Sequence, residues 1–177
     1  MNIFVLDQDQ RKAVACLHDK HVVCMTKETT QILSTVRQQL GDLLPGLPNK
    51  THSKHPCVVW AGSSKENYLW LVFYFKCICE EYTYRYFKLH QYYDLLNRFS
   101  DTRGFIFPEN ELSDFALAMP DQYKVEDSVQ SYRNYYLGEK VQGKVWTNRR
   151  LSELPEWLTN SLTIDQFKVN IPKGVKS

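Results

Sequence analysis

One stretch constrains the fold more than any other. Residues 65–87, KENYLWLVFYFKCICEEYTYRYF, contain no glycine or proline, and the preceding Ser63 and the acidic Glu66 form an S-x-x-E capping box. Their β-branched and aromatic content would also suit strands. However, their apolar residues recur at helical spacing and form one stripe: Tyr68, Val72, Phe75, Cys79, Tyr82 and Tyr86. The sequence therefore predicts a long central helix over 65–87.

Other segments also read as helices. Residues 1–6, MNIFVL, are apolar and predict a short extended N-terminus, after which Asp7 caps a helix over 8–17. A second helix fits 19–40 and ends before Gly41, and residues 41–56, rich in proline and glycine, form a loop. Further helices are expected over the following ranges: 89–99, Pro108–Met119 and 125–137.

The length of 177 residues suits one domain. We expect a mostly α-helical chain with a single compact domain over 1–158 and a loosely attached tail over 159–177. The apolar run 68–75 is too short to span a bilayer, so no membrane association is expected. Five cysteines are an odd number and no secretion signal precedes them, which indicates a reducing cytoplasm, that of the host cell, rather than a disulfide framework.

Unusual polar residues cluster in LHDKHVVCM, residues 17–25. Asp19 and His21 lie near a predicted helix start, where the helix dipole favours an anion and lowers the pKa of a histidine. The simpler interpretation is a capping aspartate beside a half-exposed histidine. Two other possibilities stay open: a metal held by the H-x-x-H pairs His18/His21 and His52/His55, and a nucleophilic Cys24 or Cys57 beside a histidine. We expect no bound metal ion or cofactor.

Basic and aromatic residues alternate in 82–93 and 131–150. Cations that bind phosphates and rings that stack on bases make such stretches candidates for nucleic-acid binding, and amphipathic helices with core tyrosines give the same pattern. The net charge of +2 does not by itself indicate a nucleic-acid partner. Motifs of P-loop, Rossmann, zincin and serine-hydrolase proteins are absent from the sequence.

Several short sequence segments, distributed from residue 1 to about 158, resemble those of a family of small bacteriophage proteins. Cys24 stands where members of that family often carry lysine. The segments are MNIFVLDQD, CLHDKHVV, THSKHPCVVW, NYLWL, EEYTYRY, AMPDQYK, YRNYYLGEK and WTNRR followed by PEW.

The layout also resembles the pyrimidine-dimer DNA glycosylases of the endonuclease V type, which are compact all-α proteins. In that family the α-amino group of the chain attacks C1′ of the damaged nucleotide, helped by a glutamate on the first long helix. An amine suits this role because its ordinary pKa of about 7.7–8.0 leaves a usable neutral fraction near pH 7. The resemblance makes Met1, retained before asparagine, the nucleophile. The family's basic–acidic pair falls on Lys20-His21, with Asp19 adjacent and Glu28 two turns further on.

These observations give two functional hypotheses. The first is a DNA glycosylase, an abasic-site lyase or a base-modifying relative, in which Met1, Asp19, Lys20 and His21 are the catalytic group. We expect that cluster to line a pocket with the N-terminus and residues 131–150. The second is a phage protein without enzymatic activity that binds a host protein or a nucleotide through its aromatic and basic surface. The predicted nucleic-acid-binding residues are His55, Arg133, Lys140, Trp146 and Arg149.

Overall fold

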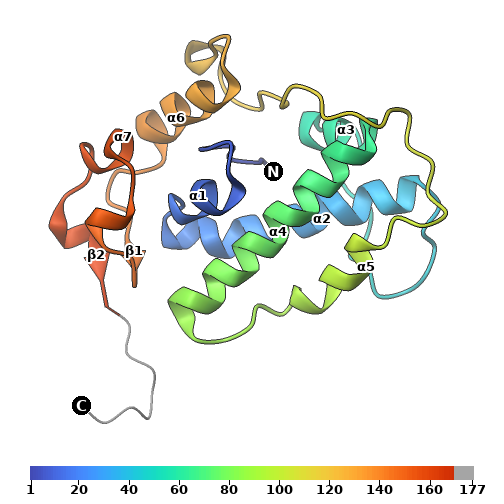
Figure 1. Ribbon diagram of the computed structural model, residues 1–177, viewed down its shortest axis with the longest axis horizontal. Helices are drawn as coiled ribbons and strands as arrows, with labels where there is room; N and C mark the ends of the chain where they lie inside the picture. Colours follow the sequence, from blue (N-terminus) through green and yellow to red (C-terminus); the bar gives the residue numbers. More distant parts are fainter. Residues whose placement is uncertain (170–177) are drawn as a thin grey trace.

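Helix α4 (Lys65–Tyr86) is the axis around which the other helices pack. The structure is a computed structural model that describes residues 1–169. The helices in contact with α4 are α1 (Gln10–Ala15), α2 (Asp19–Gln39), α3 (Pro56–Ser63) and α5 (Leu96–Ser100). Figure 1 shows α2 and α4 crossing in the middle of the molecule, with the N-terminus above them. The mostly α-helical fold and its central helix are therefore confirmed.

The predicted cap of α4 is displaced by one residue. Ser64, not Ser63, accepts the hydrogen bond from the backbone N–H of Asn67, at 3.0 Å. Helix α3 runs up to Ser63, whose hydroxyl donates to the carbonyl of Trp60, so the extended residue between the two helices is Ser64. The helix ends at Phe87, which adopts a left-handed conformation with φ of 53°.

Helix α2 begins and ends within one residue of the prediction, but its cap differs. The Nδ1 atom of His18 accepts a hydrogen bond from the backbone N–H of His21, at 3.3 Å. Asp19 is the first helical residue rather than the cap. Helix α1 is shorter than predicted, because Asp9 rather than Asp7 accepts the free N–H groups at its start.

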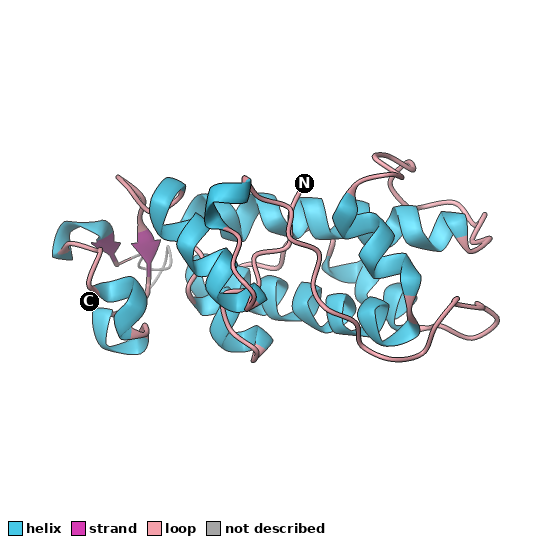
Figure 2. Cartoon of the chain, turned by 90° about the horizontal axis from the view of Figure 1, so that it is seen from above, coloured by secondary structure: helices cyan, strands magenta, loops and turns pink. Residues whose placement is uncertain are grey.

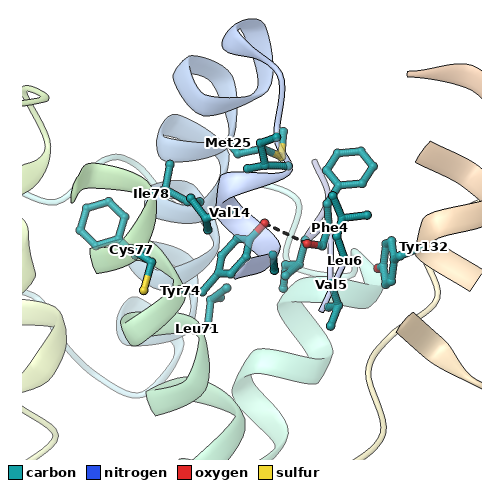
Figure 3. Packing of buried hydrophobic residues seen from close by; sticks show 14 of the residues in the cluster. Phe4, Val5, Leu6, Val14, Met25, Leu71, Tyr74, Cys77, Ile78 and Tyr132 are labelled. Atoms are coloured by element: carbon teal, nitrogen blue, oxygen red, sulfur yellow. Dashed lines mark hydrogen bonds between the residues drawn. The ribbon is translucent and has the colours of Figure 1, made fainter. Parts of the chain in front are cut away.

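The extended N-terminal segment lies in the core. Residues Ile3 to Leu6 are at most 3% exposed. The hydroxyl of Tyr74 on α4 donates to the carbonyl of Phe4, at 3.0 Å. Figure 3 shows this segment between Tyr74 and Tyr132, so two helices hold it from opposite sides.

Helix α3 was not predicted, because the Pro56 at its start reads as part of a proline-rich loop. In the structure Pro56 is its first residue, where the fixed φ angle and the missing N–H cost nothing. The ring of His55 caps it by accepting from the N–H of Cys57, at 3.2 Å. The loop predicted over 41–56 is confirmed up to His55.

The helix predicted over 108–119 is wrong. The segment 101–120, named the strap, contains no helix and arches from α5 to the next helix over the top of the view in Figure 1. Its backbone bonds to the start of α4 instead: Lys65 N–H donates to the carbonyl of Glu109, at 2.9 Å, and Glu109 N–H donates to that of Ser63, at 3.1 Å. These long-range bonds replace those of a local helix.

The C-terminal part builds a second layer beside α1 and α2. Helix α6 (Ser128–Glu139) matches the helix predicted over 125–137, and it continues through Gly138. A short parallel pair joins β1 (Trp146–Thr147) to β2 (Phe167–Lys168). Figure 2 shows this pair at one end of the molecule. The remaining short elements are η1 (Tyr93–Leu95), η2 (Asp121–Tyr123), η3 (Leu151–Glu153), α7 (Glu156–Thr159) and η4 (Ile164–Gln166).

Two predicted segments take a different form. The helix predicted over 89–99 is divided into η1 and α5. In the predicted tail, 159–169 contain η4 and β2, and the Gln166 side chain donates to the carbonyls of Val141 and Lys144. The rest of that tail, 170–177, lies outside the described residues. No helix within residues 1–169 is long and apolar enough to cross a membrane.

Candidate active site at the N-terminus

The α-amino group of the chain lies beside a carboxylate of helix α2. The nitrogen of Met1 is 3.6 Å from Oε2 of Glu28. The same oxygen accepts a hydrogen bond from the backbone N–H of Asn2, at 2.9 Å. The side chain of Met1 is only 4% exposed, whereas that of Glu28 is 27% exposed. The N-terminal segment is thus anchored, while the carboxylate of Glu28 stays accessible to solvent.

The start of α3 forms another wall of this site. Cys57 is fully buried, and its sulfur lies 4.0 Å from Oδ1 of Asn2. Burial raises the pKa of the Cys57 thiol to about 12, so the thiolate of a nucleophilic cysteine is disfavoured. His55 is close enough for charge effects: burial first, then the positive charge of the N-terminus, lowers its pKa.

His21 lies on the same face of α2 as Glu28, seven residues before it. Two helical turns separate the pair by roughly 10 Å along the axis. The ring of His21 stacks on Phe4 at 4.6 Å and on His18 at 3.9 Å between centroids. Burial, followed by the charge of Lys140, lowers the pKa of His21 to about 4. Its imidazole is therefore neutral near pH 7.

Cationic side chains gather around these two histidines. Lys20, Lys140 and Lys144 all lower the pKa of His21 through their charge. The ammonium of Lys140 lies 4.5 Å from the ring centroid of Tyr135 and 3.4 Å from a carboxylate oxygen of Glu139. Lys20 is exposed. The structure therefore places part of the predicted basic and aromatic surface next to the N-terminal segment.

The carboxylate of Asp19 binds Arg85 and Thr147, which lie outside the N-terminal segment. Its Oδ1 accepts from Arg85 Nη1 at 3.0 Å and from the backbone N–H of Thr147 at 2.9 Å. Its Oδ2 accepts from the hydroxyl of Thr147 at 2.6 Å. Asp19 thus joins α2 to α4 and β1.

The three other predicted nucleic-acid-binding residues, Arg133, Trp146 and Arg149, each make contacts within the protein. Arg133 donates to the carbonyl of Leu6 at 2.8 Å and so holds the N-terminal segment. Trp146 is fully buried and its indole N–H donates to the carbonyl of Cys16, so its ring offers no face to a base. Arg149 forms an ion pair with Glu81.

Glu28 and Asn2 were not among the predicted site residues. The resemblance does bring in Glu28, two turns beyond Lys20-His21, and residues two turns apart share a helix face, but the predicted catalytic group leaves it out. No comparable signal marks Asn2. Within residues 1–169, no group of three or more histidine, cysteine, aspartate or glutamate side chains is placed to hold a metal ion.

The amino-acid sequence was also compared with known protein families. Residues 1–95 match the model of a family described as pyrimidine dimer DNA glycosylase. Neither the curated proteins nor the solved structures contain a match to the chain. The matched residues include the amine, Glu28 and the helices α1 to α4. Because the match spans more than half of the 177 residues, the chain belongs to the pyrimidine dimer DNA glycosylase family.

Proposed function

We propose that this protein is a DNA glycosylase whose nucleophile is the α-amino group of Met1 and whose proton-transfer group is Glu28. The observation that carries the proposal is the 3.6 Å separation between the amine nitrogen and Glu28 Oε2. Both residues fall inside the part of the chain that matches the family. The substrate is duplex DNA that contains a pyrimidine dimer or an abasic site.

The proposed chemistry uses the amine in its neutral form. As the nitrogen bonds to C1′, the glycosidic bond breaks and the base leaves with its electron pair. The C1′–O4′ bond then opens, the nitrogen gives up a proton, and O4′ gains one, which leaves a protonated Schiff base. In a lyase step, loss of a proton from C2′ expels the 3′ phosphate. Hydrolysis of the imine restores the amine.

The position of Glu28 suits the proton transfers. Its Oε2 accepts the Asn2 N–H, which orients the carboxylate beside the amine, and its partial exposure keeps it open to solvent. A carboxylate there can accept the proton of the amine and return it to O4′. His21 is about two turns away along α2, so we assign it to the wall of the site rather than to this step.

The lysines near His21 are the proposed contacts to phosphate. Lys20 and Lys140 come from α2 and from the end of α6, and Lys144 follows in the next loop. Phosphate contacts of this kind are independent of sequence and weaken with salt. They would position the duplex while the N-terminal amine reaches the damaged nucleotide.

The test is borohydride trapping of a covalent protein–DNA adduct on abasic, uracil-containing and dimer-containing duplexes. Glu28→Gln should slow trapping about 10²–10⁴-fold, the usual loss when a general acid–base is removed. Glu66→Gln, a change of the exposed glutamate in the first turn of α4, is the matched control and should trap as the parent does. An N-terminal extension, which converts the amine into an amide, should abolish trapping without unfolding the domain.

Absence of an adduct on all three substrates would contradict the proposal. DNA or nucleotide binding without trapping would then favour the non-enzymatic alternative.

A further inference from the structure

The side chain of Asn2 connects the N-terminus to three distant parts of the chain. Asn2 is 9% exposed. Its Nδ2 donates to the carbonyl of Ala118 in the strap, at 2.9 Å. Its Oδ1 accepts from the backbone N–H of Ile3 at 2.7 Å and lies 3.1 Å from the hydroxyl of Tyr132 on α6. Together with Cys57 of α3, these contacts surround the amide on several sides.

Two of these contacts come from outside the region that matches the family, residues 1–95. The hydroxyl of Tyr132 also lies 2.6 Å from the carbonyl of Ala116 in the strap, so its single hydrogen is shared between that carbonyl and Asn2 Oδ1. Tyr132 is fully buried, and Figure 3 shows its ring beside the N-terminal segment. The strap and α6 therefore close over residue 2 while its backbone N–H faces Glu28.

We propose that Asn2 is a positioning residue, and that its amide, held by the strap and Tyr132, fixes the Met1 amine against Glu28. This inference rests on the proposed function, since it concerns the same amine. The physical reason is that an N-terminal residue has only one peptide bond to restrain it. Without the side-chain anchor, the amine would sample many orientations, and the gain from correct orientation would be lost.

The first test is Asn2→Asp, which keeps the size of the side chain but turns the donor that faces the Ala118 carbonyl into an acceptor. We expect trapping at pH 7 to fall at least about tenfold, because the amine loses its orientation. A purely structural role would lower the folded fraction but leave the rate per folded molecule unchanged. Intact mass verifies that Met1 is retained.

The matched control is Asn67→Asp. Asn67 is fully buried and bridges the strap to helices, donating to the carbonyl of Trp60 at 2.8 Å and accepting from the N–H of Ser113 at 2.9 Å. It makes these bonds away from the N-terminal segment. This variant should melt at a lower temperature but should trap at the parent rate per folded molecule.

A second pair of variants, Tyr132→Phe and Tyr136→Phe, tests the proposal even if Asn2→Asp does not fold. Tyr132→Phe removes the hydroxyl beside Asn2. Tyr136→Phe, on the same helix and equally buried, removes the hydroxyl that accepts from His18 N–H at 2.9 Å. Only Tyr132→Phe should slow trapping at saturating DNA, several-fold and with an unchanged dissociation constant. Equal trapping rates in the two variants would overturn the proposal.

A readout without DNA separates this inference from the proposed function. The amide hydrogen of Ile3, which is donated to Asn2 Oδ1, should exchange faster in Tyr132→Phe than in Tyr136→Phe. If the parent forms no adduct but this difference is seen, the chemistry is wrong and the anchoring stands. If exchange at Ile3 is the same in both variants, the anchoring is wrong whatever the chemistry.

Discussion

Asp19→Ala distinguishes a structural aspartate from a catalytic one. The carboxylate accepts three hydrogen bonds, from Arg85 at 3.0 Å and from the N–H and hydroxyl of Thr147 at 2.9 Å and 2.6 Å. Its partner Arg85 is fully buried, while Asp19 itself is 24% exposed. A hydrogen bond to a charged group contributes about 1.5–3 kcal/mol, and such terms are not additive. Glu81 and the carbonyl of Ala15 still hold Arg85 after the change.

We therefore expect a loss of about 3 kcal/mol in the free energy of unfolding, against about 0.5–2 kcal/mol for a residue that only caps a helix. Urea denaturation followed by circular dichroism measures it. Asp121→Ala, in an ion pair with Lys124 where the aspartate is 94% exposed, is the control and should cost under about 1 kcal/mol. A loss of 1 kcal/mol or less for Asp19→Ala would refute the structural role.

Three further predictions concern packing, pH and salt. Gly138→Ala should lower the melting temperature, because the new Cβ would lie 2.7 Å from the ring of Tyr123, and such overpacking costs about 1–3 kcal/mol. The free energy of unfolding should fall as the pH drops below about 6.5, the pKa of a histidine in the unfolded chain. The reason is that burial lowers the pKa of His18 to about 2 and that of His21 to about 4 in the folded protein. Urea titrations at pH 7.5 and pH 5 check this. Lys140→Ala should reduce the slope of log Kd for duplex DNA against log salt by about 1, measured by fluorescence anisotropy.

A specific result would contradict each of these three predictions. Gly62→Ala, whose Cβ would meet Val36 at an ordinary 3.6 Å, should be tolerated, and equal melting shifts at the two glycines would contradict the packing explanation. An unfolding free energy that is flat from pH 7.5 to pH 5 would contradict neutral, buried histidines. An unchanged salt slope would remove Lys140 from the DNA surface.

The sequence predicts the long helices well because their signals are local. An uninterrupted apolar stripe is sufficient to identify α2 and α4, although the capping residue of each lies one position away from the predicted one. The errors occur where long-range contacts decide the structure. Residues 108–119 could form a helix by local criteria, but Glu109 pairs with the backbone at the start of α4. Proline at the start of α3 looks like a loop residue until His55 is seen to cap that helix.

The candidate site was located only in part for the same reason. The resemblance marks Met1 as the nucleophile and brings in Glu28, but the predicted catalytic group contains Asp19, Lys20 and His21 instead, whereas the carboxylate beside the amine is Glu28. Asp19 belongs to the same cluster in sequence but points to Thr147 instead. The contacts of Asn2 reach Ala118 and Tyr132, which are more than 100 residues away in sequence, so no local pattern could reveal them.

The most direct test of the central claim is to locate the bond that borohydride traps. The parent protein is incubated with an abasic duplex, reduced, digested with protease and nuclease, and examined by mass spectrometry. We expect a reduced deoxyribose remnant on the α-amino nitrogen of Met1, formed about 10²–10⁴-fold more slowly when Glu28 is replaced by glutamine. A remnant on a lysine side chain, with the N-terminal peptide unmodified, would contradict it.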